Sequence, residues 1–184
     1  MMTTVDGFPI QVCDTGPEKS SVVVLLCAAQ RALAAYDAVC ERLHTASLRT
    51  IVIGPDPRLT PKSVVGILDV LDIDWCVLVG DRVGGELAWE LAATRLDRFT
   101  GLVVIDRGHP RVADLTGVIR DDHCPPVEIN TTALVSNSDA QVVARASQRY
   151  VYGDYRVVDL LGRRNAHEST AQLAAEIVLR TSTW

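Results

Sequence analysis

The sequence predicts an α/β fold, with a mostly parallel twisted sheet of about eight strands and helices on both faces. Apolar, β-branched runs alternate along the chain with segments whose apolar residues recur at helical spacing. Runs such as SVVVLLC (residues 21–27) are apolar throughout, which is typical of strands buried on both faces. Strands that alternate with helices favour a parallel sheet. No repeat or linker separates these elements, so we expect a single domain over residues 1–184.

The first half of the chain is expected to form a hairpin and then alternating strands and helices. An Asp6-Gly7 turn signal precedes the first strand. Thr60-Pro61 is a typical helix start, with a hydroxyl at the cap and proline at the first helical position. The expected elements are strands at 8–13, 21–27 and 49–53, and helices at 33–43 and from residue 61.

The second half continues this alternation around one polar stretch, residues 106–130. Residues 169–172 (STAQ) resemble a capping box that opens a last helix. The expected elements are strands at 75–79, 100–105, 131–136 and 155–161, and helices at 83–95, 139–149 and after residue 169.

Composition excludes several classes of function. Eighteen basic against 23 acidic side chains give a net charge of −5, so neither nucleic acid nor an anionic membrane is an expected partner. No apolar run approaches the roughly 18 to 20 residues that span a bilayer, and no signal peptide is recognisable, so we expect a cytoplasmic protein. Five scattered cysteines and four histidines show no metal-ligand spacing. We therefore expect no metal and no cofactor.

The stretch VLVGDRVGGELAWEL (residues 77–91) is the most informative of the sequence. It begins as a strand, breaks at Gly80 and restarts at Gly84-Gly85 as an amphipathic helix. The G-x-S-x-G nucleophile elbow of hydrolases has this strand–turn–helix shape, but here Arg82 takes the place of the serine. A dinucleotide-binding fingerprint is less suitable, because the spacing is not G-x-G-x-x-G and close helix packing explains the glycines better.

Four segments together resemble the α/β-hydrolase fold superfamily: VDGFPIQVCDTGPEKSSVVVLLCAA, LDVLDIDWCVLVGDRVGGELAWELAATRLDRFTGLVVID, TTALVSNSDAQ and YRVVDLLGRRNAHEST. They cover nearly all of the chain in the order that the family has. The family's triad follows the order nucleophile, acid, histidine. The resemblance therefore implies Arg82 at the nucleophile position, Asp139 as the acid with Asp106 as a second candidate, and His167 as the base.

Two departures from the family indicate a chain that has lost catalysis. Arg82 has five donors and no lone pair to give, so it does not attack a carbonyl. Cys27-Ala28-Ala29-Gln30 replaces the His-Gly that helps to form the oxyanion hole in the family. Residues 106–130 are also too few for a helical cap, which predicts a short, lidless member with an open site.

Two interpretations of Arg82 remain. Its guanidinium and the free N–H groups that begin the next helix, at Val83 and Gly84, form a typical site for a small carboxylate or phosphate. Alternatively, Arg82 neutralises Asp81, Asp106 or Asp139 without any ligand. Both favour a non-catalytic role in binding a ligand or a protein partner. The expected ligand-binding residues are Arg82, Val83, Cys27, Ala28 and Asp106.

An enzymatic alternative uses a different nucleophile. Cys27 at a strand end could be activated by His167, which would give a weak or atypical ester or thioester hydrolase. A buried, inert cysteine is the plainer interpretation of Cys27. Apolar surface left bare by the missing lid also predicts that the chain forms a homodimer.

Overall fold

The computed structural model describes residues 1–160 and 166–182, and for residues 166–168 it describes only the backbone. The strands are β1 (Met2–Thr3), β2 (Pro9–Ile10), β3 (Val12–Thr15), β4 (Val22–Leu26), β5 (Arg49–Ile53), β6 (Cys76–Asp81), β7 (Phe99–Ile105), β8 (Thr131–Val135) and β9 (Tyr155–Asp159). The helices are α1 (Asp37–Thr45), preceded by a short 3-10 turn at Leu33–Tyr36, α2 (Pro61–Val70), α3 (Val83–Thr94), α4 (Ser138–Ser147), followed by a 3-10 turn at Gln148–Tyr150, and α5 (Ala166–Thr181).

The main sheet has seven strands in the order β3-β5-β4-β6-β7-β8-β9. All neighbours are parallel except β3, which pairs antiparallel with β5. The expected first strand, residues 8–13, is divided: β2 pairs with β1 in a separate two-stranded sheet, and β3 joins the main sheet. The mostly parallel α/β fold is confirmed, with seven strands in place of about eight.

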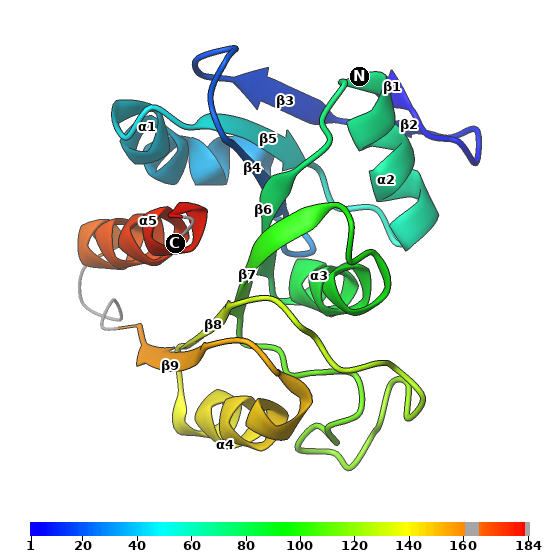
Figure 1. The fold of residues 1–184 in the computed structure, drawn as a ribbon, viewed down its shortest axis with the longest axis vertical. Coiled ribbons are helices and arrows are strands. Elements are labelled where there is room, and N and C mark those ends of the chain that lie inside the picture. Colours follow the sequence, from blue (N-terminus) through cyan, green and yellow to red (C-terminus); the bar gives the residue numbers. More distant parts are fainter. Residues whose placement is uncertain (161–165, 183–184) are drawn as a thin grey trace.

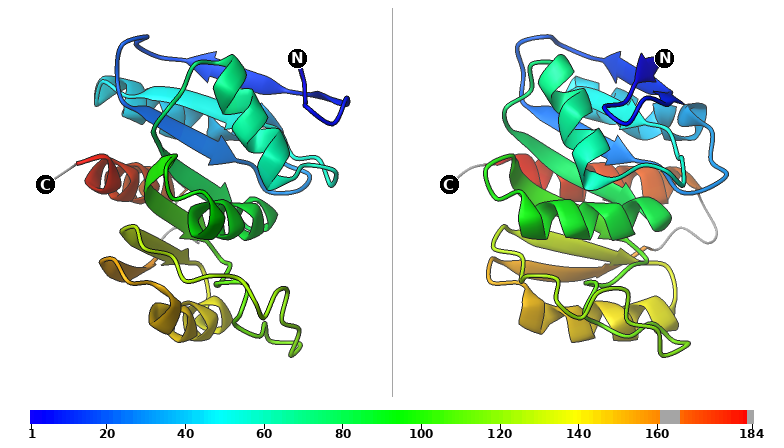
Figure 2. Two further views of the ribbon diagram at one scale, coloured as in Figure 1. Left: turned by 45° about the vertical axis from the view of Figure 1, so that its right-hand side comes forward. Right: turned by 90° about the vertical axis from the view of Figure 1, so that its right-hand side faces the viewer.

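Helices cover both faces of this sheet (Figure 1). Successive residues of a strand point to opposite faces. Val23 and Leu25 accordingly pack in one apolar cluster with α1 and α5, whereas Val24 and Leu26 pack in a second cluster with α2 and α3. In Figure 2 the helices α2, α3 and α4 lie in front of the sheet and α1 and α5 lie behind it. The continuous apolar runs of the sequence follow from this burial on both faces.

The helix starts show one success and one error of the sequence interpretation. Thr60 caps α2 as expected: its hydroxyl accepts a hydrogen bond from the Ser63 N–H at 3.2 Å, and the Ser63 hydroxyl accepts one from the Thr60 N–H. The capping box at residues 169–172 is wrong, because α5 already begins at Ala166 and Ser169 lies inside it. A serine with a glutamine three residues later favours a helix start but also occurs inside helices.

Residues 106–130 contain no helix and no strand of the main sheet, in agreement with the absence of a helical cap. Their course over α3 is fixed by His109, whose fully buried ring stacks on Tyr150 at 4.7 Å and meets Trp89 edge-on at 5.5 Å. Across the described residues, each helix is too short or too polar to traverse a lipid bilayer.

Candidate functional site

A sharp turn joins β6 to α3 at Arg82. Arg82 has φ +52° and ψ −108°, a region that side chains with a β-carbon rarely adopt. Its N–H donates to the Ile105 carbonyl at 3.0 Å, and its carbonyl accepts from the Gly85 N–H at 2.8 Å. These bonds hold residue 82 at the carboxyl end of the sheet, where parallel α/β sheets place their sites.

The glycines around this turn permit a close approach of α3 to the sheet. A β-carbon added at Gly84 would lie 2.2 Å from the Leu26 carbonyl oxygen, and one added at Gly80 would lie 2.5 Å from the Gly85 Cα. A real β-carbon does not approach backbone atoms this closely. A side chain at Gly80 or Gly84 would therefore force α3 away from the sheet. The interpretation of Gly84 and Gly85 as packing residues is confirmed.

Arg82 takes part in a chain of buried hydrogen bonds. Its Nη1 donates to Asp81 Oδ1 at 2.9 Å, and the Tyr36 hydroxyl donates to Asp81 Oδ2 at 2.7 Å. Asp81 is almost wholly buried, whereas 39% of the Arg82 side chain is exposed. Each oxygen of a buried carboxylate therefore has a donor, as its burial requires. Tyr36 falls within the helix expected at 33–43, and no pattern in the sequence indicated this role.

The amide of Ala28 is also engaged. The Ala28 N–H donates to the Tyr36 oxygen at 2.9 Å, and burial is the main reason that the pKa of Tyr36 is raised. In the family that the sequence resembles, this segment supplies part of the oxyanion hole. Here the tyrosine hydroxyl occupies the donor that an oxyanion would need.

Of the two acid candidates, Asp106 is the one beside Arg82. Asp106 follows β7, and its Oδ2 lies 3.9 Å from Arg82 Nη2. Its carboxylate accepts from the Ser136 N–H at 2.8 Å and from the Ser136 hydroxyl at 2.5 Å. Asp139 lies exposed in the first turn of α4, and within residues 1–160 and 166–182 it makes no ion pair with Arg82. Asp139 lies in the first turn of a helix, where a negative charge interacts favourably with the helix dipole.

The candidate base, His167, lies in the first turn of α5, and its side chain is outside the described residues. Its role stays a prediction.

Cys27 lies directly after β4 and is 3% exposed. Burial, followed by the negative charge of Asp81, raises the pKa of this thiol to about 12. At neutral pH the group is a protonated thiol, which is a poor nucleophile. Cys40, Cys76 and Cys124 are buried as well, Cys13 is exposed, and all five cysteines are free.

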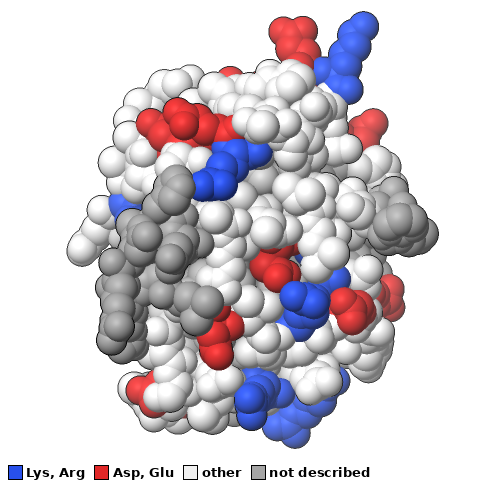
Figure 3. All heavy atoms as spheres, turned by 90° about the vertical axis from the view of Figure 1, so that its left-hand side faces the viewer, with Lys and Arg blue, Asp and Glu red and all other residues white. Residues whose placement is uncertain are grey.

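Two hollows flank the turn, one on each face of the sheet. The Arg82 hollow, of about 380 Å³, is lined by Arg82 and Asp81 together with Arg31, Tyr36 and parts of α1 and α5. The α3 hollow, of about 830 Å³, lies between the loops after β4 and β5, the first turns of α3 and the segment after β7. Over the face that carries α1 and α5, acidic and basic side chains form small groups of both signs with no large area of one sign (Figure 3).

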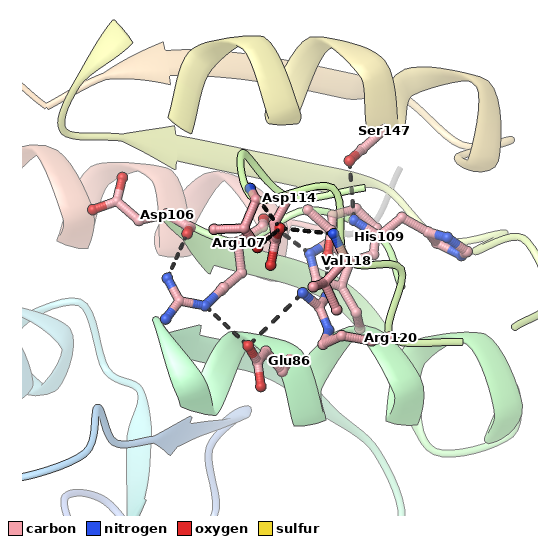
Figure 4. A network of polar contacts seen from close by, with 11 residues as sticks. Glu86, Asp106, Arg107, His109, Asp114, Val118, Arg120 and Ser147 are labelled. Atoms are coloured by element: carbon pink, nitrogen blue, oxygen red, sulfur yellow. Dashed lines mark hydrogen bonds and ion pairs between the residues drawn. The ribbon is translucent and has the colours of Figure 1, made fainter. Parts of the chain in front are cut away.

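One glutamate fastens the segment after β7 to α3 (Figure 4). Glu86 Oε1 lies 3.1 Å from Arg107 Nε and 3.8 Å from Arg120 Nη1. Arg120 also donates to the Gly108 carbonyl at 2.6 Å, and the Asp114 carboxylate accepts from the Val118 N–H at 3.0 Å. The segment that replaces a lid is therefore a fixed wall of the α3 hollow. Within the described residues, no three His, Cys, Asp or Glu side chains gather as a metal site would need.

Comparison with known proteins places the chain by its fold. No protein-family model and no curated protein matches the sequence. An esterase from Exiguobacterium antarcticum is similar over 97% of this chain and 100% of its own, with a TM-score of 0.75 at 14% identity. Epoxide hydrolase A from Mycobacterium thermoresistibile is similar over 90% of this chain and 93% of its own, with a TM-score of 0.72 at 11% identity.

A third solved structure, one of the novel epoxide hydrolases of the α/β-hydrolase superfamily from metagenomes of hot environments, is similar over 99% of this chain and 97% of its own. Its TM-score is 0.75 at 13% identity. At such identities these likenesses establish the α/β-hydrolase fold, as the sequence predicts.

Proposed function

We propose that this chain is a non-catalytic binding protein built on the α/β-hydrolase fold. The observation that carries the proposal is the residue at the apex of the turn, where a hydrolase of this fold needs its nucleophile. Arg82 occupies the apex and donates to Asp81 at 2.9 Å. A guanidinium has no lone pair to donate, so no covalent acyl intermediate forms there.

The surroundings of Arg82 support the same function. The Ala28 N–H, which would stabilise an oxyanion, is bonded to Tyr36, and Tyr36 in turn is held by Asp81. Replacing Arg82 alone would therefore leave the Ala28 N–H bonded to Tyr36. Loss of one oxyanion donor lowers turnover by roughly a hundredfold or more in serine hydrolases.

The test is covalent labelling and ester turnover. We expect wild type to form no adduct with a fluorophosphonate probe by mass spectrometry and to hydrolyse p-nitrophenyl esters no faster than buffer. Arg82→Ser and the surface control Arg149→Ser are measured beside it. Turnover that appears only in Arg82→Ser marks a lost nucleophile, whereas an adduct on wild type overturns the proposal.

A second candidate function, binding of a small carboxylate or phosphate at Arg82, is favoured by the Arg82 hollow. Arg31 and Arg82 both line it, and 39% of the Arg82 side chain stays accessible although Asp81 pairs with it. Arg82 lies beside Asp81 and 3.9 Å from Asp106, whereas Arg31 has no ion pair within the described residues, so Arg31 and the exposed donors of Arg82 would hold the anion. An arginine side chain commonly binds a carboxylate or phosphate with two parallel N–H···O hydrogen bonds.

Thermal unfolding in phosphate or acetate tests this second function. Ligand at about ten times its Kd stabilises by roughly 1.4 kcal/mol, which raises the Tm of wild type by about 3–5 °C. Arg82→Ala and Arg31→Ala are expected to lose the increase, and Arg149→Ala to keep it. An equal increase in all four proteins contradicts the assignment.

The cysteine-based hydrolase is opposed by the burial of Cys27 and its pKa of about 12. We expect iodoacetamide to label Cys13 in the folded protein and to leave Cys27 unmodified. Fast labelling of Cys27 together with ester turnover that Cys27→Ser abolishes is the contrary result. Self-association stays a prediction, which light scattering checks.

A further inference from the structure

His109 lies where four parts of the fold meet. Its fully buried ring stacks on Tyr150 in the 3-10 turn after α4 and meets Trp89 of α3 edge-on. The ring Nε2 lies 2.8 Å from the carbonyl oxygen of Pro125, sixteen residues further along the same segment. The main-chain N–H of His109 donates to the Ser147 hydroxyl of α4 at 3.0 Å (Figure 4). This one residue therefore joins two distant points of the segment after β7 and fastens that segment to α3 and α4.

The two hydrogen bonds of the ring are compatible only with neutral imidazole. The Pro125 carbonyl can only accept, so Nε2 carries the proton and donates to it. The Arg111 N–H can only donate, so Nδ1, at 3.2 Å from it, must be unprotonated to accept. A second proton on the ring would set an N–H group against the Arg111 N–H and leave both without an acceptor. Because the ring is fully buried, this arrangement is costly as long as the segment stays in place.

The charges that face the ring are mostly positive. They come from its own segment and from the 3-10 turn after α4: Arg111, Arg120, Arg149 and Asp121. The contacts from α3 and α4, Trp89 and Ser147, are uncharged. Burial is the main reason that the pKa of His109 is lowered from its ordinary 6.5, and Arg111 and Arg120 lower it further against the Pro125 carbonyl and Asp121. Geometry and charge therefore both oppose a proton on the closed ring.

The segment that His109 fastens has little else to hold it. Along residues 106–130, all of which the structure describes, there is no helix and no strand of the main sheet. The buried apolar side chains of this segment are Val112, Cys124 and Val127, whereas Leu115, Val118 and Ile119 are exposed. Glu86 of α3 adds ion pairs with Arg107 and Arg120. Parts of a fold with few buried apolar contacts open at a lower free energy than its central sheet.

We propose that His109 is a pH-sensitive latch, whose neutral ring holds the segment after β7 against α3 and whose protonation releases that segment. The segment lines the α3 hollow through Pro110, Arg120 and Asp121, so its release opens this hollow. Because the pKa of the closed ring is below 6.5, the latch contributes its full stability above about pH 6.5 and loses it as the pH falls toward the lowered pKa. The proposal goes beyond the function proposed for Arg82 and does not depend on it.

Hydrogen exchange of wild type at several pH values measures the release. Each exchange rate, divided by the intrinsic rate at that pH, gives the equilibrium constant for opening. Opening lets one proton bind, so the constant for residues 108–127 is expected to be level above about pH 6.5 and to rise up to about thirtyfold by about pH 5. It is also expected to exceed the constant for β7 at every pH.

Two results of this measurement overturn the proposal. An opening constant of residues 108–127 that is the same at about pH 7.5 and about pH 5 shows that no proton is taken up on opening. Equal opening constants for this segment and for β7 show that acid unfolds the whole chain and that the segment is not released by itself.

A pair of histidine variants assigns the proton. His109→Gln keeps a donor and an acceptor but takes up no proton in this range. We expect it to open more readily at every pH, while the ratio of its opening constants at about pH 5 and about pH 7.5 falls from about thirtyfold to about one. The exposed His123→Gln in the same segment is the matched control and is expected to keep the wild-type ratio. A wild-type ratio in His109→Gln overturns the proposal.

Nuclear magnetic resonance of the histidine rings in wild type tests the latch even if His109→Gln does not fold. We expect the ring nitrogens of His109 to show the neutral Nε2–H tautomer for as long as the Arg111 amide is protected from exchange. A protonated His109 ring together with a protected Arg111 amide is the contrary result.

Arg82→Ala distinguishes this proposal from the proposed function. We expect it to lose the stabilisation by phosphate and to keep the wild-type ratio of opening constants. A ratio of one in wild type overturns the latch while the labelling results at residue 82 stand. Ester hydrolysis by wild type would overturn the non-catalytic function without changing this ratio.

Discussion

Arg82 and Arg180 form ion pairs of equal length that are buried in opposite ways. Arg82 lies 2.9 Å from Asp81, and the exposed fractions of the two side chains are 39% and 5%. Arg180 lies 2.9 Å from Asp154, and the fractions are 5% and 62%. At the turn the acid is buried and the arginine reaches solvent, whereas on α5 the arginine is buried and the acid reaches solvent.

The difference shows which side chain of each ion pair is buried and therefore needs its hydrogen bonds satisfied. Arg180 donates to the Thr132 hydroxyl at 2.8 Å and to the Thr131 carbonyl at 3.0 Å, so its guanidinium joins α5 to the sheet. Arg82 donates to Asp81, which also has the Tyr36 hydroxyl. Arg180 is therefore a structural group, whereas the exposed part of Arg82 is compatible with the anion binding that we propose there.

The largest expected effect comes from the buried arginine. Arg180→Met leaves two buried acceptors on β8 without their donor, which costs about 3 kcal/mol and lowers the Tm by roughly 6–12 °C. Asp154→Asn, which removes only the exposed partner, is expected to cost at most about 0.5 kcal/mol. Urea unfolding monitored by circular dichroism measures both. Equal losses in the two variants would remove the basis of the comparison.

A smaller effect is expected at the turn. Arg82→Ala leaves the Asp81 carboxylate buried with one donor, Tyr36, and is expected to cost about 1–2 kcal/mol. The double variant with Asp81→Asn also removes the buried charge. Its loss of unfolding free energy is therefore expected to be about 1 kcal/mol smaller than the sum of the losses in the two single variants. A double-mutant cycle in urea measures this coupling. Strict additivity contradicts the ion pair.

The smallest effect isolates the backbone of the turn. Because φ is +52° at Arg82, glycine fits there better than alanine, and Arg82→Gly is expected to be about 1 kcal/mol more stable than Arg82→Ala. At Val142, exposed inside α4, the order reverses, and Val142→Gly is expected to be roughly 0.5–1 kcal/mol less stable than Val142→Ala. Thermal unfolding of the four variants checks both signs.

Local pattern was enough for the order of the elements. Arg49–Ile53 forms β5 as expected, and α3 ends at Thr94, one residue before the expected end. The start of α5 was misplaced by four residues, because a capping signal depends on which side chains face the first free N–H groups. The contact between Trp89 on α3 and His109 in the segment after β7 was not predicted. The residues around each of them along the chain carry no signal that the two rings meet.

The sequence by itself determined the α/β sheet and the turn with Arg82 at its apex, because each follows from the chemistry and spacing of neighbouring residues. Only the tertiary structure decided that Asp106 and not Asp139 meets Arg82, that Tyr36 occupies the Ala28 amide, and that two hollows flank the turn. Those contacts join residues far apart in the chain. Sheet twist and loop paths, which no local pattern encodes, set their distances.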